Sequence, residues 1–217
     1  MRPDGEDGLG GEDFVYRCER ATSAHADGLL ALFESAGSGC FCQYWYFEGD
    51  KNAWLERCYL KPEENRAALV ARLARPDLCG VVALSPSGQV CGWMNLSRVG
   101  SVPRLYDQRV YRNLPCFQGG PGDRGLSHRE NVFAVACCYV AEADRGRGVG
   151  RALLATAIAE AKKAGGSALE AFPRATPEGE QLRADEVWLG PEAMFVSAGF
   201  APVSDFRPYP VLRLHLP

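Results

Sequence analysis

The sequence predicts an α/β fold in which helices flank a mixed central sheet. Residues 132–140 form an apolar run without polar alternation, as expected of a central strand that is covered on both faces. A glycine-rich turn and a helical pattern over residues 152–164 follow this run directly. Residues 80–84 and 89–96 form a predicted β-hairpin before it. The chain of 217 residues is long enough for one core, so we expect a single domain over residues 14–217.

The N-terminal part of the chain alternates between strand and helix patterns. Residues 1–13 are rich in glycine and acidic side chains and have little to bury, which predicts a disordered tail. Residues 14–20 alternate in part, as in a strand near a sheet edge, and residues 24–35 place leucines at helical spacing. Residues 61–75 form the next predicted helix, because Pro62 suits its first turn and a proline follows its end.

Two segments interrupt this pattern. Residues 98–131 contain several prolines and a Gly-Gly-Pro-Gly run, so no regular element covers them. Their tyrosines and Phe117 give them something to pack with, which favours a partly ordered lid. A second insertion, residues 173–190, is rich in Glu and Arg and is expected at the solvent-exposed rim of the site.

The turn after the apolar run has the composition of an anion-binding site. Gly146, Gly148 and Gly150 alternate with other residues, and Arg145 and Arg151 flank them. Glycine allows the backbone to approach a ligand closely, and a helix that begins here adds free N–H groups and the positive end of its dipole. The pattern therefore predicts a site for a phosphate or pyrophosphate.

The spacing of these glycines distinguishes between families of phosphate-binding loops. A dinucleotide fold needs Gly-x-Gly-x-x-Gly, and Arg151 stands where its third glycine should be. A P-loop needs Gly-Lys-Ser/Thr, and no Lys-Ser or Lys-Thr pair occurs in the chain. The pattern that remains is Arg-x-x-Gly-x-Gly, which Arg145, Gly148 and Gly150 satisfy.

In this motif and the strand before it, the chain resembles the acyl-CoA-binding segment of the GNAT acetyltransferase superfamily. In that family the next strand lies beside the first and splays from it, a short helix ends in Gly-Phe, and two antiparallel strands finish the fold. The matching segments here are residues 168–172 for the strand, 192–198 for the helix, Gly199 and Phe200 for its end, and 211–216 for the last strand.

The resemblance implies how acetyl-CoA would be held as co-substrate. The N–H of Cys138 would meet the thioester carbonyl, and Val140 would bond the pantetheine arm as an added strand does. A thiol nucleophile at Cys137 or Cys138 is disfavoured, because no His or acidic residue is placed to activate one. The remaining expected cofactor contacts are Arg145, Gly146, Arg147, Gly148, Val149, Gly150 and Arg151.

The resemblance also places the acceptor near an aromatic run. Residues 40–47 hold five aromatic side chains, and in the family this part of the chain lines the acceptor pocket. Such runs usually pack into a core, so core packing and substrate contact both remain open. If the run lines the pocket, Tyr44 and Trp45 are the candidates to hold an amine by cation–π contact.

Acetyl transfer also requires a base and an acid. Glu170 is the best candidate for the base, as a carboxylate within an apolar strand; the alternative is a structural pair with Arg98 or Arg104, and Asp205 is a weaker second base. Many family members carry a tyrosine four residues before the Gly-Phe glycine, and that position here is Phe195. A phenyl ring has no proton to donate, so water or Tyr139 would have to protonate the thiolate.

Composition limits the partners of the protein. A net charge of −3 argues against a general nucleic-acid binder, and no apolar run approaches the length of a membrane span. The nine cysteines form no Cys-x-x-Cys pair, so reduced thiols in the cytoplasm are expected and no metal site is. The sequence thus predicts an acetyl-CoA-dependent N-acetyltransferase of a small-molecule amine, as a monomer or homodimer. The alternative is a non-catalytic acyl-CoA-binding sensor or scaffold, which Phe195 keeps open.

Overall fold

The computed structural model describes residues 16–118, 129–176, 179–180, 182–183 and 186–217, and the predicted tail, residues 1–13, lies outside this range. The described strands form one seven-stranded sheet in the order β1-β2-β3-β4-β5-β7-β6. Their bounds are Arg17–Arg20 (β1), Gly80–Leu84 (β2), Val90–Arg98 (β3), Val132–Val140 (β4), Ala168–Ala171 (β5), Ala201–Ser204 (β6) and Val211–His215 (β7). Only β4 and β5 pair in parallel, so the predicted mixed sheet is confirmed.

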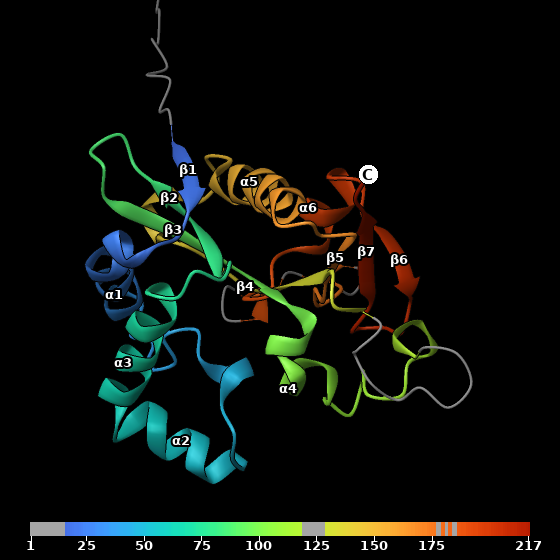
Figure 1. The fold of residues 1–217 in the computed structure, drawn as a ribbon, viewed down its shortest axis with the longest axis horizontal. Coiled ribbons are helices and arrows are strands. Elements are labelled where there is room, and N and C mark those ends of the chain that lie inside the picture. Colours follow the sequence, from blue (N-terminus) through green and yellow to red (C-terminus); the bar gives the residue numbers. More distant parts are fainter. Residues whose placement is uncertain (1–15, 119–128, 177–178, 181, 184–185) are drawn as a thin grey trace, which may run out of the picture.

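Helices cover both faces of the sheet, as Figure 1 shows. The longest, α5, packs across β1 to β4 on one face, and α1 packs with α3 on the other. The α-helices are Ala26–Ser35 (α1), Lys51–Tyr59 (α2), Pro62–Leu73 (α3), Pro103–Tyr106 (α4), Val149–Lys163 (α5) and Glu192–Ser197 (α6). Short 3₁₀ turns are Ser23–His25 (η1), Tyr44–Tyr46 (η2), Val99–Ser101 (η3), Pro115–Phe117 (η4) and Glu142–Asp144 (η6).

Apolar periodicity explains how α5 is held. Leu153, Leu154, Ala157 and Ala161 are buried, and they join one core cluster with Val135 of β4. These positions recur at helical spacing, so one face of the helix lies on the sheet. The core on this side fixes the N-terminus of α5 directly after the end of β4.

The sheet opens where β4 passes the end of β5. The two strands pair from Val132 with Ala168 to Val135 with Ala171, and β4 then continues alone to Val140. The last residues of β4 therefore have a free edge facing away from β3. This is the splay that the sequence predicts.

Two differences from the sequence-based expectation concern helix α2 and the 98–131 insertion. Helix α2 is not predicted, because none of its residues is buried and its pattern is weak; its start is marked by Asp50, whose side chain accepts a 2.9 Å hydrogen bond from the Ala53 amide. The described part of the 98–131 insertion is packed rather than lid-like. Its Tyr106, Tyr111 and Phe117 are buried against Phe172.

None of the described helices combines the length and the apolar content that a membrane crossing requires.

Candidate active site

A β-bulge prepares the exposed end of β4. Leu96 pairs with Val135 and Asn95 with Cys137, so Ala136 is an extra residue in β4. The indole Nε1 of Trp45 donates a 2.7 Å hydrogen bond to the Ala136 carbonyl. Bulges re-aim the backbone that follows them. Here that backbone carries Cys138, at the beginning of the free edge.

The segment Arg145–Arg151, called the cradle below, has the backbone that a bound anion requires. Gly146 and Gly148 have φ values of +74° and +82°, and a Cβ added at either position would meet no atom within 4 Å. Gly148 is the N-cap of α5, and the first helical bond runs from the Arg151 amide to the Gly148 carbonyl over 3.0 Å. The amides before Arg151 therefore face open space at the positive end of the helix dipole.

A groove of 260 Å³, the cradle groove, connects the cradle with the end of β4. It contains Cys138 and Val140 together with five of the predicted cradle residues, whereas Arg147 and Arg151 do not line it. The lining residues are Cys138, Tyr139, Val140, Asp144, Arg145, Gly146, Gly148, Val149, Gly150, Val187, Pro191 and Met194. Most of the predicted cofactor contacts are thus brought together along one path.

The side chain of Arg145 folds back over the strand end. Its Nε donates a 3.0 Å hydrogen bond to the Val140 carbonyl, and its guanidinium carbon lies 5.7 Å from the centre of the Tyr139 ring. This places a fixed positive charge beside the groove. It also leaves the Val140 amide, and not its carbonyl, as the group that can bind a ligand along the free edge.

A second cavity, called the aromatic pocket, opens on the α1 side of β4 and has a volume of 730 Å³. It shares Cys138, Tyr139 and Arg145 with the cradle groove, so the two spaces adjoin at the splay. Both predicted acceptor residues, Tyr44 and Trp45, line it. The other lining residues are Phe33, Ser35, Ala36, Ser38, Cys40, Cys42, Trp54, Cys137, Glu142 and Trp188.

The wall of the aromatic pocket is a cluster of rings. Trp188 stacks on Trp45 with ring centres 5.3 Å apart and an angle of 16° between the planes. Tyr44 meets Trp45 and Trp54 edge to face, at 4.6 Å and 5.2 Å. Trp45 itself is 5% exposed, so it serves both the core and the pocket wall. Core packing of the aromatic run is therefore confirmed for Trp45, and its contact with a substrate stays a prediction.

The backbone carbonyl of Trp188 lies at the junction of the cradle groove and the aromatic pocket. It accepts a 2.7 Å hydrogen bond from the Cys138 amide, the donor predicted to meet a thioester carbonyl. Through its stacked ring and this carbonyl, Trp188 closes the splay between the cradle groove and the aromatic pocket. A carbonyl ligand at Cys138 must take the place of the Trp188 carbonyl.

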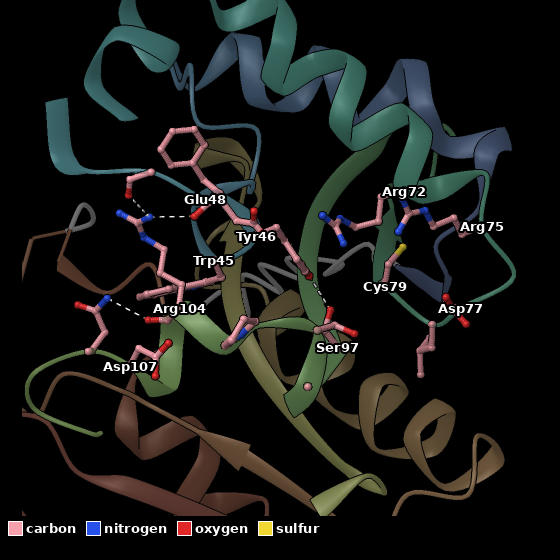
Figure 2. Close-up of a pocket in the computed structure, with 17 residues that line it drawn as sticks. Trp45, Tyr46, Glu48, Arg72, Arg75, Asp77, Cys79, Ser97, Arg104 and Asp107 are labelled. Carbon is pink, nitrogen blue, oxygen red and sulfur yellow. Dashed lines mark hydrogen bonds between the residues drawn. The ribbon is translucent and has the colours of Figure 1, made fainter. Parts of the chain in front are cut away.

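A third cavity, the polar pocket, is larger than these two and lies elsewhere. Its 830 Å³ are lined by charged side chains including Arg72, Arg75 and Arg104, and no cradle residue takes part. Figure 2 shows the arginines projecting into this space from α3 and from the α4 side, with Tyr46 and Ser97 hydrogen-bonded between them. Only Trp45 is common to the polar and aromatic pockets. Cavity volume alone therefore does not identify the site. The aromatic pocket is identified because it adjoins the cradle groove, which the polar pocket does not.

Glu170 lies outside these cavities. It pairs with Ala134 in the sheet, four residues before Cys138, which corresponds to roughly 13 Å along β4. Its fully buried carboxylate forms ion pairs with Arg129 and Arg213 and accepts a 2.7 Å hydrogen bond from the Tyr106 hydroxyl.

This pairing corresponds to the structural alternative, with different partners. The expected arginines are engaged elsewhere, Arg98 with the Glu130 carbonyl and Arg104 with the carbonyls of Phe47 and Gly49. Asp205 is exposed and paired with Arg207. A role for Glu170 as base stays a prediction, which its burial and its two cationic partners disfavour.

Phe195 is fully buried, with its ring 5.4 Å from that of Phe200. It therefore supplies no hydroxyl at the splay, as the sequence indicates. Tyr139 lines both the cradle groove and the aromatic pocket and is the hydroxyl nearest in the chain to Cys138. Burial raises the pKa of the Cys138 thiol to about 12, so this side chain stays a neutral thiol at pH 7.

Sequence reasoning misses three residues of the site. Trp54 and Trp188 complete the aromatic pocket, and Glu142 is the one carboxylate among its lining residues. Trp54 belongs to the unpredicted helix α2, and Trp188 to an insertion without a pattern. Glu142 follows β4 directly, so its place at the end of the strand was the available signal.

Comparison with known proteins identifies the family that shares this arrangement. The sequence model of the Acetyltransferase (GNAT) family matches residues 41–183, which is more than half of the chain. The chain belongs to the GNAT acetyltransferase family. Its membership rests on the segment that contains the bulged strand, the splay and the cradle. No curated protein sequence matches the chain.

Solved structures share the GNAT fold at low identity. The GNAT domain of S. lividans PAT aligns with a TM-score of 0.51 and 18% identity, over 93% of this chain and 90% of that one. The yncA protein of Salmonella typhimurium, solved with its cofactor acetyl-CoA, aligns with a TM-score of 0.50 and 16% identity, over 94% and 95%. The paia N-acetyltransferase of Thermoplasma acidophilum, in complex with coenzyme A, gives 0.50 and 10%, over 93% and 99%.

Proposed function

We propose that this GNAT protein transfers an acetyl group from acetyl-CoA to the primary amine of a small molecule. The observation that carries the proposal is the Cys138 amide, which points into the splay where the cradle groove and the aromatic pocket adjoin. One space is suited to an acyl donor and the other to an acceptor, and a single polarising group lies between them.

The cradle fits the phosphate end of coenzyme A. Gly146 and Gly148 leave open the space that side chains would fill, and the amides of Val149 and Gly150 precede the first helical bond of α5. When bound, acetyl-CoA supplies an activated acetyl group as a thioester. The free Val140 amide would hold the pantetheine arm as an added strand, and the cradle would hold the pyrophosphate.

The Cys138 amide would polarise the thioester carbonyl in place of its bond to the Trp188 carbonyl. A preorganised N–H donor at a developing oxyanion commonly accounts for about 3 kcal/mol of barrier reduction. The bulge at Ala136, held by Trp45, fixes the direction of this donor.

The acceptor would enter through the aromatic pocket. Its wall includes the rings of Tyr44, Trp54 and Trp188, which would contact an ammonium group, and Glu142 lies at the same pocket. The Arg104 guanidinium already lies 4.7 Å from the centre of the Tyr44 ring. We assign Glu142, or water beside it, to take the proton that the amine loses before attack. Tyr139, which borders both spaces, is the group we assign to protonate the departing thiolate.

A second candidate function is a non-catalytic acyl-CoA sensor. Two observations favour it: Phe195 provides no acid, and the Trp188 carbonyl already occupies the Cys138 amide. In a sensor, ligand binding would release the Trp188 segment without any chemistry.

Turnover separates the two functions. Wild-type protein is incubated with acetyl-CoA and a panel of primary amines, and both CoA and acetylated amine are followed by mass spectrometry, because nine free cysteines would consume a thiol reagent. The proposal expects stoichiometric formation of CoA and one N-acetylated product. If acetyl-CoA binds but no amine or peptide is acetylated, the enzyme hypothesis is wrong and the sensor hypothesis is favoured.

A further inference from the structure

The backbone is strained at a turn beside the aromatic pocket. Phe41 and Cys42 both have positive φ values, +43° and +59°, which side chains other than glycine rarely adopt. Consecutive strained residues persist only where the surroundings hold them, and they gather at functional positions. The consequence of this turn is that the Cys42 side chain points inward and is only 5% exposed.

Buried hydrogen-bond donors converge on the sulfur of Cys42. The Asn95 amide nitrogen donates to it over 3.4 Å. The same nitrogen also donates to the Tyr46 hydroxyl over 2.8 Å, and the Asn95 oxygen accepts from Ser97 over 3.3 Å, so these bonds hold the amide beside the sulfur. The indole N–H of the fully buried Trp93 has no hydrogen-bond partner among the described residues, sulfur included, although it lies close enough to Cys42 to act on the charge of its sulfur.

An unpaired buried donor destabilises the fold, and a neutral thiol is a weak acceptor. A thiolate would accept from Asn95 and Trp93 together, so these donors match an ionised sulfur. A positive charge lies near this group of side chains. The Arg72 guanidinium is 3.2 Å from the centre of the Tyr46 ring, and Figure 2 shows both side chains on the polar-pocket side.

The titratable surroundings agree with this geometry. Burial alone would raise the pKa of Cys42, but the hydrogen bond from Asn95, the nearby donor groups of Cys137 and Trp93, and the charge of Arg72 together lower it. The pKa of each of the other eight cysteines is raised, chiefly by burial or, for Cys137, by its contact with Cys42. The titratable groups that face Cys42 are Arg72 from α3, Cys40 and Tyr46 from its own segment, Cys79 before β2, and Cys137 from β4.

Cys40 provides an internal contrast two residues away. It lines the same pocket and is more exposed than Cys42, yet burial of its thiol raises its pKa to about 11. At pH 7 a thiol with that pKa is ionised in about one molecule in 10,000. Exposure and ionisation therefore rank the two cysteines in opposite orders.

We propose that Cys42 is a modification site, the reactive cysteine of this protein, whose sulfur attacks small electrophiles, hydroperoxides in particular, that enter the aromatic pocket. The thiolate attacks one peroxide oxygen and the O–O bond breaks. Sulfur is oxidised to a sulfenic acid, and the peroxide is reduced to an alcohol or water once its leaving oxygen takes a proton from solvent. An adduct here would narrow the pocket beside Tyr44 and Trp45, which would couple oxidant exposure to acceptor access.

The test compares modification rates of individual cysteines and needs no acetyltransferase activity, so it stands apart from the proposed function. Folded protein is treated at pH 7 with limiting iodoacetamide, or with tert-butyl hydroperoxide and dimedone, and fragment spectra separate Cys42 from Cys40. We expect Cys42 to react at least tenfold faster than Cys40, and to lose this advantage in urea. Prior modification of Cys40 or of any other cysteine would overturn the proposal.

Variants link the rate to the donors. Cys40→Ser should retain the fast reaction and Cys42→Ser should lose it. Trp93→Phe keeps the ring but removes the N–H, so the Cys42 rate should fall severalfold and its pH midpoint should rise. A folded Trp93→Phe protein with the parental rate and midpoint would contradict the role of the indole. If this variant does not fold, the wild-type profile decides: a Cys42 midpoint below about 8.5 supports the proposal, and one above it refutes it.

Discussion

The cradle groove and the aromatic pocket meet at Cys138, but the chain builds them in opposite ways. Most of the groove is made of one continuous segment, from the end of β4 through Gly148 into α5, and Val187, Pro191 and Met194 complete it. The pocket is made of side chains from α1, the 40–47 turn, α2, β4 and the segment around Trp188. Backbone sites bind what many related proteins share, whereas side-chain sites determine what each one selects. This difference separates the local donor side from the acceptor side, which distant segments assemble.

The largest effect is expected at the centre of the groove. Gly148→Asp places a carboxylate in the open space of the cradle and removes the glycine that the φ of +82° requires. Acetyl-CoA affinity, measured by titration calorimetry, should fall at least 100-fold. Gly88→Asp is the matched control, because Gly88 has the same φ of +82° and the same open space in a distant hairpin turn. Equal losses in both variants would mean that strain, and not the cradle, is responsible.

Substitution of Glu170 tests whether its buried charge takes part in the reaction or stabilises the core. Glu170→Gln leaves Arg129 and Arg213 without their buried counter-charge, so the free energy of unfolding should fall by about 3–5 kcal/mol. Glu64→Gln is the control, since the Glu64 side chain is half exposed in its 3.7 Å pair with Arg57, and its loss should change stability by less than about 1 kcal/mol. A stable Glu170→Gln protein that loses the acidic limb of its pH–rate profile would instead identify Glu170 as the base.

Trp188 tests the junction of the two regions. Trp188→Ala removes the stacking on Trp45, which typically stabilises a pair by about 0.5–1.5 kcal/mol. The segment would then release the Cys138 amide more readily, so acetyl-CoA should bind roughly two- to tenfold tighter by calorimetry. Trp54→Ala removes a ring from the same pocket without that stacking and should leave acetyl-CoA affinity unchanged. Weaker binding in Trp188→Ala would show that the segment holds the donor rather than blocking it.

The smallest effect is expected at Phe195. Because this ring is fully buried against Phe200, Phe195→Tyr should change the rate of CoA release less than about twofold. The buried hydroxyl should lower the free energy of unfolding by about 1–3 kcal/mol, measured by urea denaturation. A tenfold faster reaction would reveal that this position faces the leaving thiolate after all.

The same contrast explains how far the sequence could be interpreted. The donor side is local, because strand, Arg145, Gly148 and α5 follow one another, so the glycine spacing together with the family resemblance predicts most of the groove. The acceptor side is not local, and its completion by Trp54 and Trp188 depends on where α2 and an insertion fold. Tyr44 and Trp45 could be predicted as pocket residues only because five aromatic residues stand close together in the chain.

Glu170 illustrates a second limit. Its position in an apolar strand is visible in the sequence, but its partners are not. Arg213 is 43 residues away and approaches through the antiparallel pairing of β5 with β7. A buried carboxylate is the same sequence signal whether it serves as a base or as an anchor, and only the arrangement of neighbouring strands distinguishes the two.

The Cys138 amide provides the most direct test of the account, because donor and acceptor sides are proposed to meet there. Protein labelled with ¹⁵N-cysteine gives one amide signal for each of nine cysteines, and a Cys138→Ala variant assigns the signal of interest. Saturating acetyl-CoA should shift the Cys138 signal strongly, as its partner changes from the Trp188 carbonyl to the thioester, while the signals of Cys18 and Cys58 stay in place. An unmoved Cys138 signal at saturation would contradict the account.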